Sequence, residues 1–288
     1  MISWFSMHAG SYADTAALVS SNQGIGALGR IEPRSRVIKI SHNAGPEGAQ
    51  VRQLLVQEGD LVNSGDKLAI LSDHAKRKAE VEAAKTFVTV LEAQLKTERH
   101  LLAFNQREFQ RYQSLQQDAA ASESQADSKR LALQQSETTI QRLSAEIANA
   151  RFKQKIAEAE LENTFIHAPI AGTVLKILTR PGERIKDSGL LEMADLSQLD
   201  AVAEVYEADL LQIKPEQQAL VSATGLSRAY RAQVREIGFQ VKKNDLNDTD
   251  PLADIDNRIV EVRLTLEADA VGVLRHQIFR QVKIRFVP

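Results

Sequence analysis

One uninterrupted stretch constrains this chain more than any other feature: neither glycine nor proline occurs between Asp73 and Asn163. Ala, Glu, Gln, Lys, Leu and Arg dominate the stretch, and these residue types favour helix. Glycine and proline are the residues that most often end or interrupt a helix, so their absence over this length predicts helix as its only regular structure.

Apolar side chains recur along this stretch at alternating steps of four and three residues. In each half, seven of the nine positions are apolar or aromatic. The first set is Ala84, Val88, Leu91, Leu95, Glu98, Leu102, Asn105, Phe109 and Tyr112, and the second is Leu133, Ser136, Ile140, Leu143, Ile147, Ala150, Gln154, Ala157 and Leu161. Two heptad stripes of similar length predict one coiled coil.

A polar segment separates the two stripes. Within it, Ser122 and Gln125 have the spacing of a capping box, which starts a new helix. We therefore expect the chain to reverse near residues 117–122, so that residues 73–163 form a helical hairpin. Each arm would hold roughly 40 to 45 residues and, at about 1.5 Å per residue, stand roughly 60 to 68 Å tall.

The segments on either side of the predicted hairpin, residues 36–72 and 164–196, repeat one another. Both consist of short apolar runs separated by glycines, which is typical of short strands and tight turns. The spacing from Val51 to Gly59 equals the spacing from Val174 to Gly182. Such a repeat predicts two half-motifs related by a pseudo-two-fold axis, neither of which can bury its apolar face alone.

The remaining residues complete an α+β fold class. From residue 197 to 288 the apolar residues alternate with polar ones, which predicts a small β-barrel domain. Residues 1–35 are expected to form an N-terminal segment that is partly disordered. No run in Met1–Gly24 approaches the roughly 20 apolar residues of a membrane span, so a membrane anchor would lie upstream of this start or come from a partner.

Composition and charge exclude several classes of function. The 36 basic and 38 acidic residues give a net charge of -2, so no overall attraction to nucleic acid is expected. The chain has no cysteine, which excludes disulfides, thiolate metal sites and thiol nucleophiles. Its six histidines are scattered without the spacing of a metal-binding face, and we predict no metal.

Catalytic motifs are also missing from the sequence. No nucleophile elbow or phosphate-binding loop stands out. Gly24, Gly26 and Gly29 have the spacing of a dinucleotide-binding motif, but they do not lie in a strand–helix–strand unit. The chain is therefore predicted to be neither an enzyme nor a holder of a cofactor.

The predicted order of half-motif, helical hairpin, second half-motif and barrel resembles the HlyD-type membrane fusion proteins, the periplasmic adaptors of tripartite exporters. Residues 56–62 (VQEGDLV) and 167–174 (HAPIAGTV) look like the two halves of a biotinyl/lipoyl-like domain. Residues 26–33 (GALGRIEP) are similar to the opening of DevB-like adaptors, which work with MacB-like ABC exporters. The resemblance implies a periplasmic, inner-membrane-associated adaptor that forms a hexameric ring.

The same resemblance points to three residues at the hairpin turn. Adaptors that dock on TolC-type outer-membrane channels carry an Arg, a Leu four positions later and a Ser seven positions after that. Arg111, Leu115 and Ser122 have this spacing. Leu115 would offer an exposed apolar contact, Arg111 a planar set of donors and Ser122 a compact polar group. In the alternative interpretation, Leu115 ends the coiled-coil core, Arg111 is solvated and Ser122 only caps a helix.

Other functions remain open at this point. A proton-driven RND efflux pump also uses adaptors with this tip motif, although those adaptors usually add a further domain. A biotinyl or lipoyl carrier subunit needs a modified lysine at the junction of its halves, where this chain has the hairpin, and Lys67 lies inside the first half. A plain coiled-coil scaffold is a third possibility. Lateral contacts between the hairpins of neighbouring copies are expected to be polar and weak. The sequence does not identify the cargo.

Overall fold

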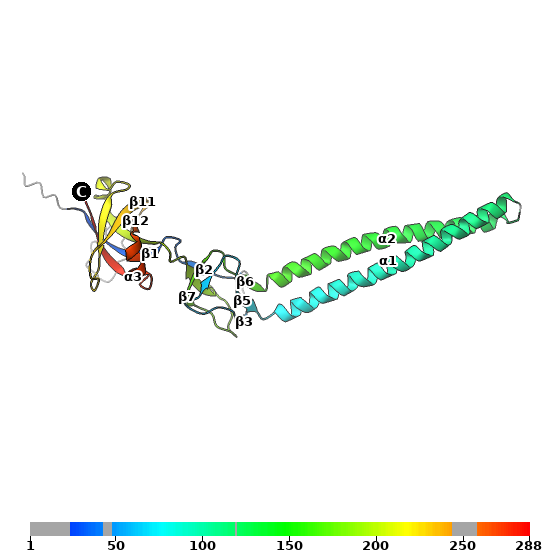
Figure 1. Ribbon diagram of the computed structural model, residues 1–288, viewed down its shortest axis with the longest axis horizontal. Helices are drawn as coiled ribbons and strands as arrows, with labels where there is room; N and C mark the ends of the chain where they lie inside the picture. Colours follow the sequence, from blue (N-terminus) through cyan, green and yellow to red (C-terminus); the bar gives the residue numbers. More distant parts are fainter. Residues whose placement is uncertain (1–23, 43–47, 119, 244–257) are drawn as a thin grey trace, which may run out of the picture. The chain divides into compact units, whose positions relative to one another are not determined.

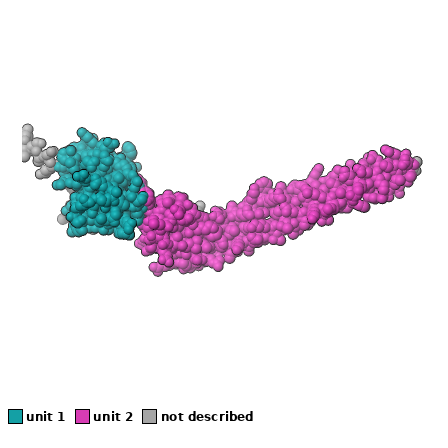
Figure 2. Space-filling view, in the orientation of Figure 1, with its two compact units in different colours: residues 1–34, 196–288 teal, residues 35–195 magenta. Residues whose placement is uncertain are grey.

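The structure is a computed structural model that describes residues 24–42, 48–118, 120–243 and 258–288. The partial disorder expected from the sequence for the N-terminal segment concerns residues 1–23, which lie outside these ranges. The chain divides into two compact units, one of residues 1–34 and 196–288 and one of residues 35–195 (Figures 1 and 2). Both helices and sheets are present, as predicted.

The long helical hairpin predicted from the sequence is confirmed. Helix α1 (His74–Gln117) has 44 residues and helix α2 (Glu123–Glu162) has 40, which correspond to about 66 and 60 Å at about 1.5 Å per residue (Figure 1). Every position of the two predicted stripes is buried or half-buried. The stripes therefore form the seam between the two helices, and burial of this seam holds the hairpin together.

Polar contacts across the seam fix the register of the hairpin. The Asn105 side-chain amide donates to Ser136 Oγ at 2.9 Å, and Ser136 is buried. Arg151 pairs with Glu92 at 2.6 Å on the hairpin surface. A shift of one helix by one turn would break the hydrogen bond between the Asn105 amide and the buried Ser136 hydroxyl. This pair therefore favours a single alignment of the two helices.

Two small sheets carry the hairpin in the second unit. One has the strand order β2-β8-β7-β4 and the other the order β3-β5-β6. Their bounds are β2 Ile38–Ile40, β8 Leu191–Ala194, β7 Gly172–Ile177, β4 Leu61–Val62, β3 Val51–Leu54, β5 Lys67–Leu71 and β6 Phe165–His167. Strands β5 and β6 pair antiparallel, with Lys67 opposite His167. The helical hairpin thus stands where a short turn would otherwise join two paired strands.

The internal repeat is visible as reciprocal backbone hydrogen bonds between the two half-motifs. The Val51 amide donates to the Glu183 carbonyl at 2.9 Å, and the Val174 amide donates to the Asp60 carbonyl at 2.9 Å. Val51 and Val174 are equivalent positions of the repeat, as are Asp60 and Glu183. Each half therefore supplies the partners that the other half lacks.

The glycines of the repeat complete this exchange. The amides of Gly182 and Gly59 donate back to the carbonyls of Val51 and Val174, both at 2.8 Å. Both glycines have a positive φ, 90° for Gly182 and 94° for Gly59. A residue with a Cβ would be strained in this conformation, which explains why glycine stands at both turns.

The first unit is a closed six-stranded barrel with the strand order β1-β13-β10-β11-β12-β9. Its strands are β1 Gly26–Pro33, β13 Gln281–Phe286, β10 Gln218–Ser222, β11 Tyr230–Lys243, β12 Arg258–Leu266 and β9 Leu199–Tyr206, and it also has a short 3-10 helix η1 Leu210–Gln212 and a helix α3 Ala268–Leu274. Alternate residues of each strand point into one apolar core, for example Leu199, Ala201, Ala203 and Val205 of β9.

Strand β1 belongs to this barrel, although the sequence analysis placed residues 1–35 in a separate N-terminal segment. It lies between β9 and β13 and closes the barrel. Its sequence begins with a glycine, contains a second one in its interior and alternates little, so the pattern gave no strand signal. The backbone at Gly29 passes so close to β9 that a Cβ there would lie 2.3 Å from the Val202 carbonyl oxygen.

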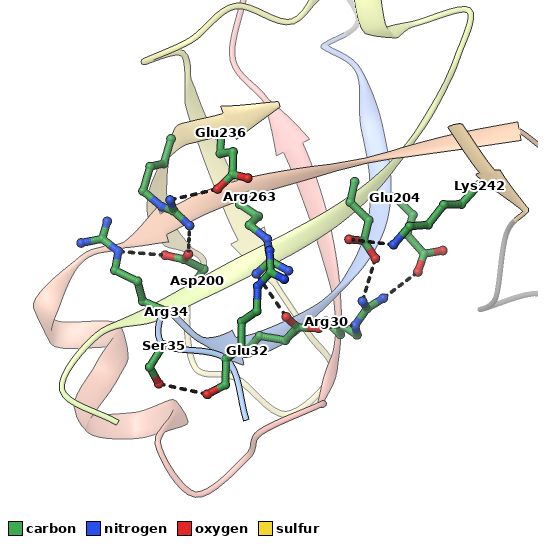
Figure 3. A network of polar contacts seen from close by, with 12 residues as sticks. Arg30, Glu32, Arg34, Ser35, Asp200, Glu204, Glu236, Lys242 and Arg263 are labelled. Atoms are coloured by element: carbon green, nitrogen blue, oxygen red, sulfur yellow. Dashed lines mark hydrogen bonds and ion pairs between the residues drawn. The ribbon is translucent and has the colours of Figure 1, made fainter. Parts of the chain in front are cut away.

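The outer face of the barrel carries a network of ion pairs (Figure 3). Arg30 contacts the carboxylates of Glu32, Glu204 and Glu261 at 2.7, 3.0 and 2.9 Å. Burial disfavours the charged form of Glu261, but the hydrogen bond and the charge of Arg30 outweigh that effect and lower the pKa of Glu261. This network joins β1, β9 and β12 on their solvent side.

Candidate docking site at the hairpin tip

The turn between α1 and α2 is closed by backbone hydrogen bonds. The Leu115 carbonyl accepts from the amides of Ala120 and Ala121 at 2.7 and 3.2 Å. At the start of α2, Ser122 Oγ accepts from the Gln125 amide at 3.3 Å, and the Gln125 side-chain oxygen accepts from the Ser122 amide at 3.2 Å. The capping box predicted from the sequence is therefore confirmed.

Arg111 is held on the surface of α1 one turn before Leu115. Its guanidinium donates to the Glu108 carboxylate at 2.9 Å, and Lys129 of α2 lies 3.4 Å from the same carboxylate. Both cations lie beside the Tyr112 ring, at 5.4 and 5.1 Å from its centroid. The Arg111 side chain is still 61% exposed, so its planar set of five donors is oriented but open to a partner.

Leu115 is half-buried rather than fully exposed. It follows Tyr112 by three residues, so part of its side chain continues the seam beyond the last stripe position. The remainder faces outward at the end of the hairpin. Its partial burial is compatible with both interpretations of the sequence, the end of the core and an apolar contact, so the contact with a channel stays a prediction.

The structure brings Arg111, Leu115 and Ser122 to the same end of the hairpin, and the side-chain hydrogen bonds of Arg111 and Ser122 go to Glu108 and Gln125. Glu108 and Lys129, which orient Arg111, were not identified from the sequence. Glu108 could have been found from its i,i+3 spacing to Arg111. Lys129 lies on the other helix, so its role could be recognised only once the register of the hairpin was known.

The structure also places Lys67, the one lysine considered for a carrier role. Lys67 is the first residue of strand β5, and its ammonium lies 3.4 Å from the centroid of the Phe165 ring. Its side chain thus packs against β6. Within the described ranges, no group of three or more His, Asp or Glu side chains is placed to bind a metal. Among the same residues, no helix has the length and apolar character to span a bilayer.

A hairpin inserted into a split sheet domain, in one chain with a six-stranded barrel, defines the class of membrane fusion proteins. The crystal structure of MacA from Actinobacillus actinomycetemcomitans shares this fold with a TM-score of 0.70 at 19% identity, covering 92% of this chain and 79% of that one. Spr0693 of Streptococcus pneumoniae R6, described as a membrane fusion protein, gives a TM-score of 0.57 at 13% identity and covers 91% and 98%.

Sequence relatives confirm the membrane fusion protein assignment, and with it the prediction of a non-enzymatic protein. The chain is 30% identical over 223 residues to the pyoverdine export membrane fusion protein PvdR of Pseudomonas aeruginosa, covering 76% of this chain and 56% of PvdR. It is 26% identical over 221 residues to the macrolide export protein MacA of Escherichia coli O157:H7, covering 75% and 58%. The chain thus spans a little over half the length of these relatives. No family model matches the chain, and the relatives do not specify the DevB-like subfamily.

Proposed function

We propose that this protein is the periplasmic adaptor of a tripartite exporter and connects an inner-membrane ABC transporter of the MacB-like type to a TolC-type outer-membrane channel. The observation that carries the proposal is the helical hairpin that replaces the turn between β5 and β6. A rigid arm of about 60 Å can bridge two partners, whereas a cofactor carrier needs a free lysine at that junction. The relatives named for pyoverdine and macrolide export support an export role.

The hairpin tip contacts the channel through Arg111, Leu115 and Ser122. Arg111 presents a planar donor group that suits carbonyl or carboxylate oxygens on the channel. Leu115 supplies the apolar part of the contact, and Ser122 lies beside it at the start of α2. The exposure of Arg111 and the partial exposure of Leu115 support this assignment.

Copies of the protein form a ring, of six copies according to the family resemblance, at the periplasmic face of the inner membrane. One hairpin alone cannot enclose a conduit, so the bridging role requires several copies. The similarity of residues 26–33 to DevB-like adaptors favours an ABC transporter over a proton-driven RND pump as the partner.

Affinity capture of the tagged full-length protein from a crosslinked cell envelope tests this proposal. Mass spectrometry should identify one ABC transporter permease and one outer-membrane channel in the captured material. Capture of an RND transporter in place of the permease would replace the partner assignment. Capture of neither membrane protein, or a biotinyl or lipoyl group on Lys67, would contradict the adaptor role itself.

A further inference from the structure

A cavity of about 680 Å³ opens on the barrel, and the residues that line it all belong to the barrel unit. Its volume lies within the range of about 300 to 1,000 Å³ that is typical of small-molecule sites. The lining comes mainly from strands β9, β1 and β13. None of the lining residues belongs to the hairpin, and the proposed function assigns them no role.

The register of the strands arranges the lining side chains in two rows. In the first row, Leu28 of β1 stands opposite Glu204 of β9 on one side and opposite Lys283 of β13 on the other. Alternate residues of a strand face the same side, so these side chains point away from the apolar core of the barrel. The second row lies two residues further along each strand and consists of Tyr206, Gly26 and Arg285.

Gly26 leaves open space in the middle of the second row. A Cβ built at this position would meet no atom within 4 Å, and Gly26 does not have a positive φ. At Gly29 of the same strand, by contrast, a Cβ would lie 2.3 Å from the Val202 carbonyl oxygen. Neither backbone conformation nor close packing therefore requires a glycine at position 26. Its missing side chain instead provides the open floor of the cavity.

The gap above Gly26 has the width of one flat ring. Strands β9 and β13 lie on either side of β1. Neighbouring strands are about 4.8 Å apart, so the backbones at Tyr206 and Arg285 are separated by roughly 9.5 Å. A ring with a flat group against each face needs about 7 Å, twice the contact distance of about 3.5 Å. The Tyr206 phenol, which is 41% exposed, and the Arg285 guanidinium are both flat groups that stack on rings.

The cavity carries a positive charge. Among the residues that the structure describes, Lys283 and Arg285 have no ion-pair partner. The acidic residue of the lining, Glu204, is bound by Arg30 at 3.0 Å, and its side chain is only 2% exposed (Figure 3). Two cations on one side of the cavity would repel a cationic ligand, whereas a carboxylate or phosphate would gain charge-assisted hydrogen bonds from them.

We infer that this cavity binds a small organic anion built on a flat aromatic ring. The ring lies over Gly26, between the Tyr206 phenol and the Arg285 guanidinium. Leu28 provides an apolar contact beside the ring, and Lys283 donates hydrogen bonds to the carboxylate or phosphate group of the ligand. The inference is independent of the proposed function, because binding in this cavity requires neither a transporter nor a channel.

Isothermal titration calorimetry of the full chain with 1-naphthyl phosphate tests the inference, since this probe carries one phosphate on a flat ring. We expect saturable binding of one molecule per chain. Inorganic phosphate lacks the ring, 1-naphthol lacks the charge, and dodecyl phosphate below its micelle concentration has an alkyl chain in place of the ring. Each of these three should bind at least about tenfold more weakly. No binding of 1-naphthyl phosphate, or equal binding of any of the three, would overturn the inference.

Gly26→Leu fills the proposed site without straining the strand, because the added Cβ meets no atom within 4 Å. We expect this variant to bind 1-naphthyl phosphate at least about tenfold more weakly than the wild type. Gly272→Leu is the matched control, since a Cβ at Gly272 of helix α3 also meets no atom within 4 Å and the position does not line the cavity. Undiminished binding by Gly26→Leu, or an equal loss in Gly272→Leu, would show that the probe does not bind over Gly26.

Lys283→Ala and Arg285→Ala test the contribution of charge. Each should weaken binding at least about fivefold, because each removes a charged donor to the ligand. Arg231→Ala should keep the wild-type affinity, since Arg231 is an exposed arginine of β11 that does not line the cavity. Thermal unfolding shows which variants are folded, and the two exposed cations decide the inference by themselves if Gly26→Leu does not fold. Equal affinity of all three alanine variants would overturn it.

Discussion

At the residue scale, the side chains proposed to contact the channel also serve the fold of the hairpin tip. Leu115 continues the seam with one part of its surface and presents the rest at the end of the hairpin. Ser122 caps α2 with the same hydroxyl that the family resemblance assigns to the channel. Substitutions at these positions therefore need readouts that separate folding from binding.

Replacing Leu115 with Ser should weaken channel capture more than it weakens the fold. The half-buried side chain contributes on the order of 1 kcal/mol to stability. An apolar contact at the centre of an interface usually matters more, so we expect capture of the channel to fall at least about fivefold. Pull-down and thermal unfolding measure the two effects. Gln116→Ser, at an exposed neighbouring position, should change neither, and an unaltered pull-down for the Leu115 variant would remove this residue from the contact.

Replacing Ser122 with Ala should loosen the first turn of α2, because the Gln125 amide loses its side-chain acceptor. Loss of such a cap costs about 0.5 to 2 kcal/mol. Hydrogen exchange at the Gln125 amide should accelerate in the Ala variant and remain near the wild-type rate in a Ser122→Thr variant, which keeps an acceptor. Equal exchange in all three proteins would show that the capping box does not stabilise this helix.

Glu261 should make the barrel sensitive to acid. Its pKa is lowered in the fold, so its ionised form stabilises the protein above the unfolded-state pKa of about 4.3, and this stabilisation disappears as the pH falls through the lower folded-state value. Melting temperatures measured between about pH 3 and 6 should therefore fall less steeply in Glu261→Gln than in the wild type. Parallel profiles would contradict this role of the Arg30 contact.

At the element scale, features that follow a sequence period could be predicted, whereas features that depend on contacts between separate elements could not. Every position that the heptad steps identified is buried or half-buried, although the buried Val81 and Ala126 were not among them, and the capping box located the start of α2. Strand β1 was missed because its glycines hide any alternation and its role depends on β9 and β13. The sequence analysis expected polar hairpin flanks from their content of Gln, Glu, Lys and Arg, whereas Phe87 and Leu101 are apolar and about half exposed.

The internal repeat makes a quantitative prediction for its two halves. Gly59 and Gly182 have nearly the same φ, and a Cβ at either position would meet no atom within 4 Å. Backbone strain is then the only cost of Gly59→Ala and of Gly182→Ala, and each should destabilise the protein by roughly 1 to 2 kcal/mol. Urea unfolding measures both values. Costs that differ by more than about 1 kcal/mol would show that the two turns are not energetically equivalent.

At the scale of the whole molecule, the proposed function assigns different tasks to two parts of one chain. In this proposal the hairpin reaches the outer-membrane channel, and the rest of the chain serves the transporter end. The hairpin could be predicted from the sequence because a long stretch without glycine or proline is visible without knowledge of any tertiary contact. The tip residues remain a prediction, since Arg111, Leu115 and Ser122 were assigned by resemblance and a binding contact depends on the partner's surface.

Because β5 and β6 already pair as neighbouring strands, residues 73–163 can be replaced by an Asn-Gly turn without separating the sheet. The most direct test of the account compares this shortened protein with the full chain in the same envelope capture. The shortened protein should still capture the ABC transporter and should lose the outer-membrane channel. Undiminished capture of the channel by the shortened protein would contradict the central claim that the hairpin makes the bridge.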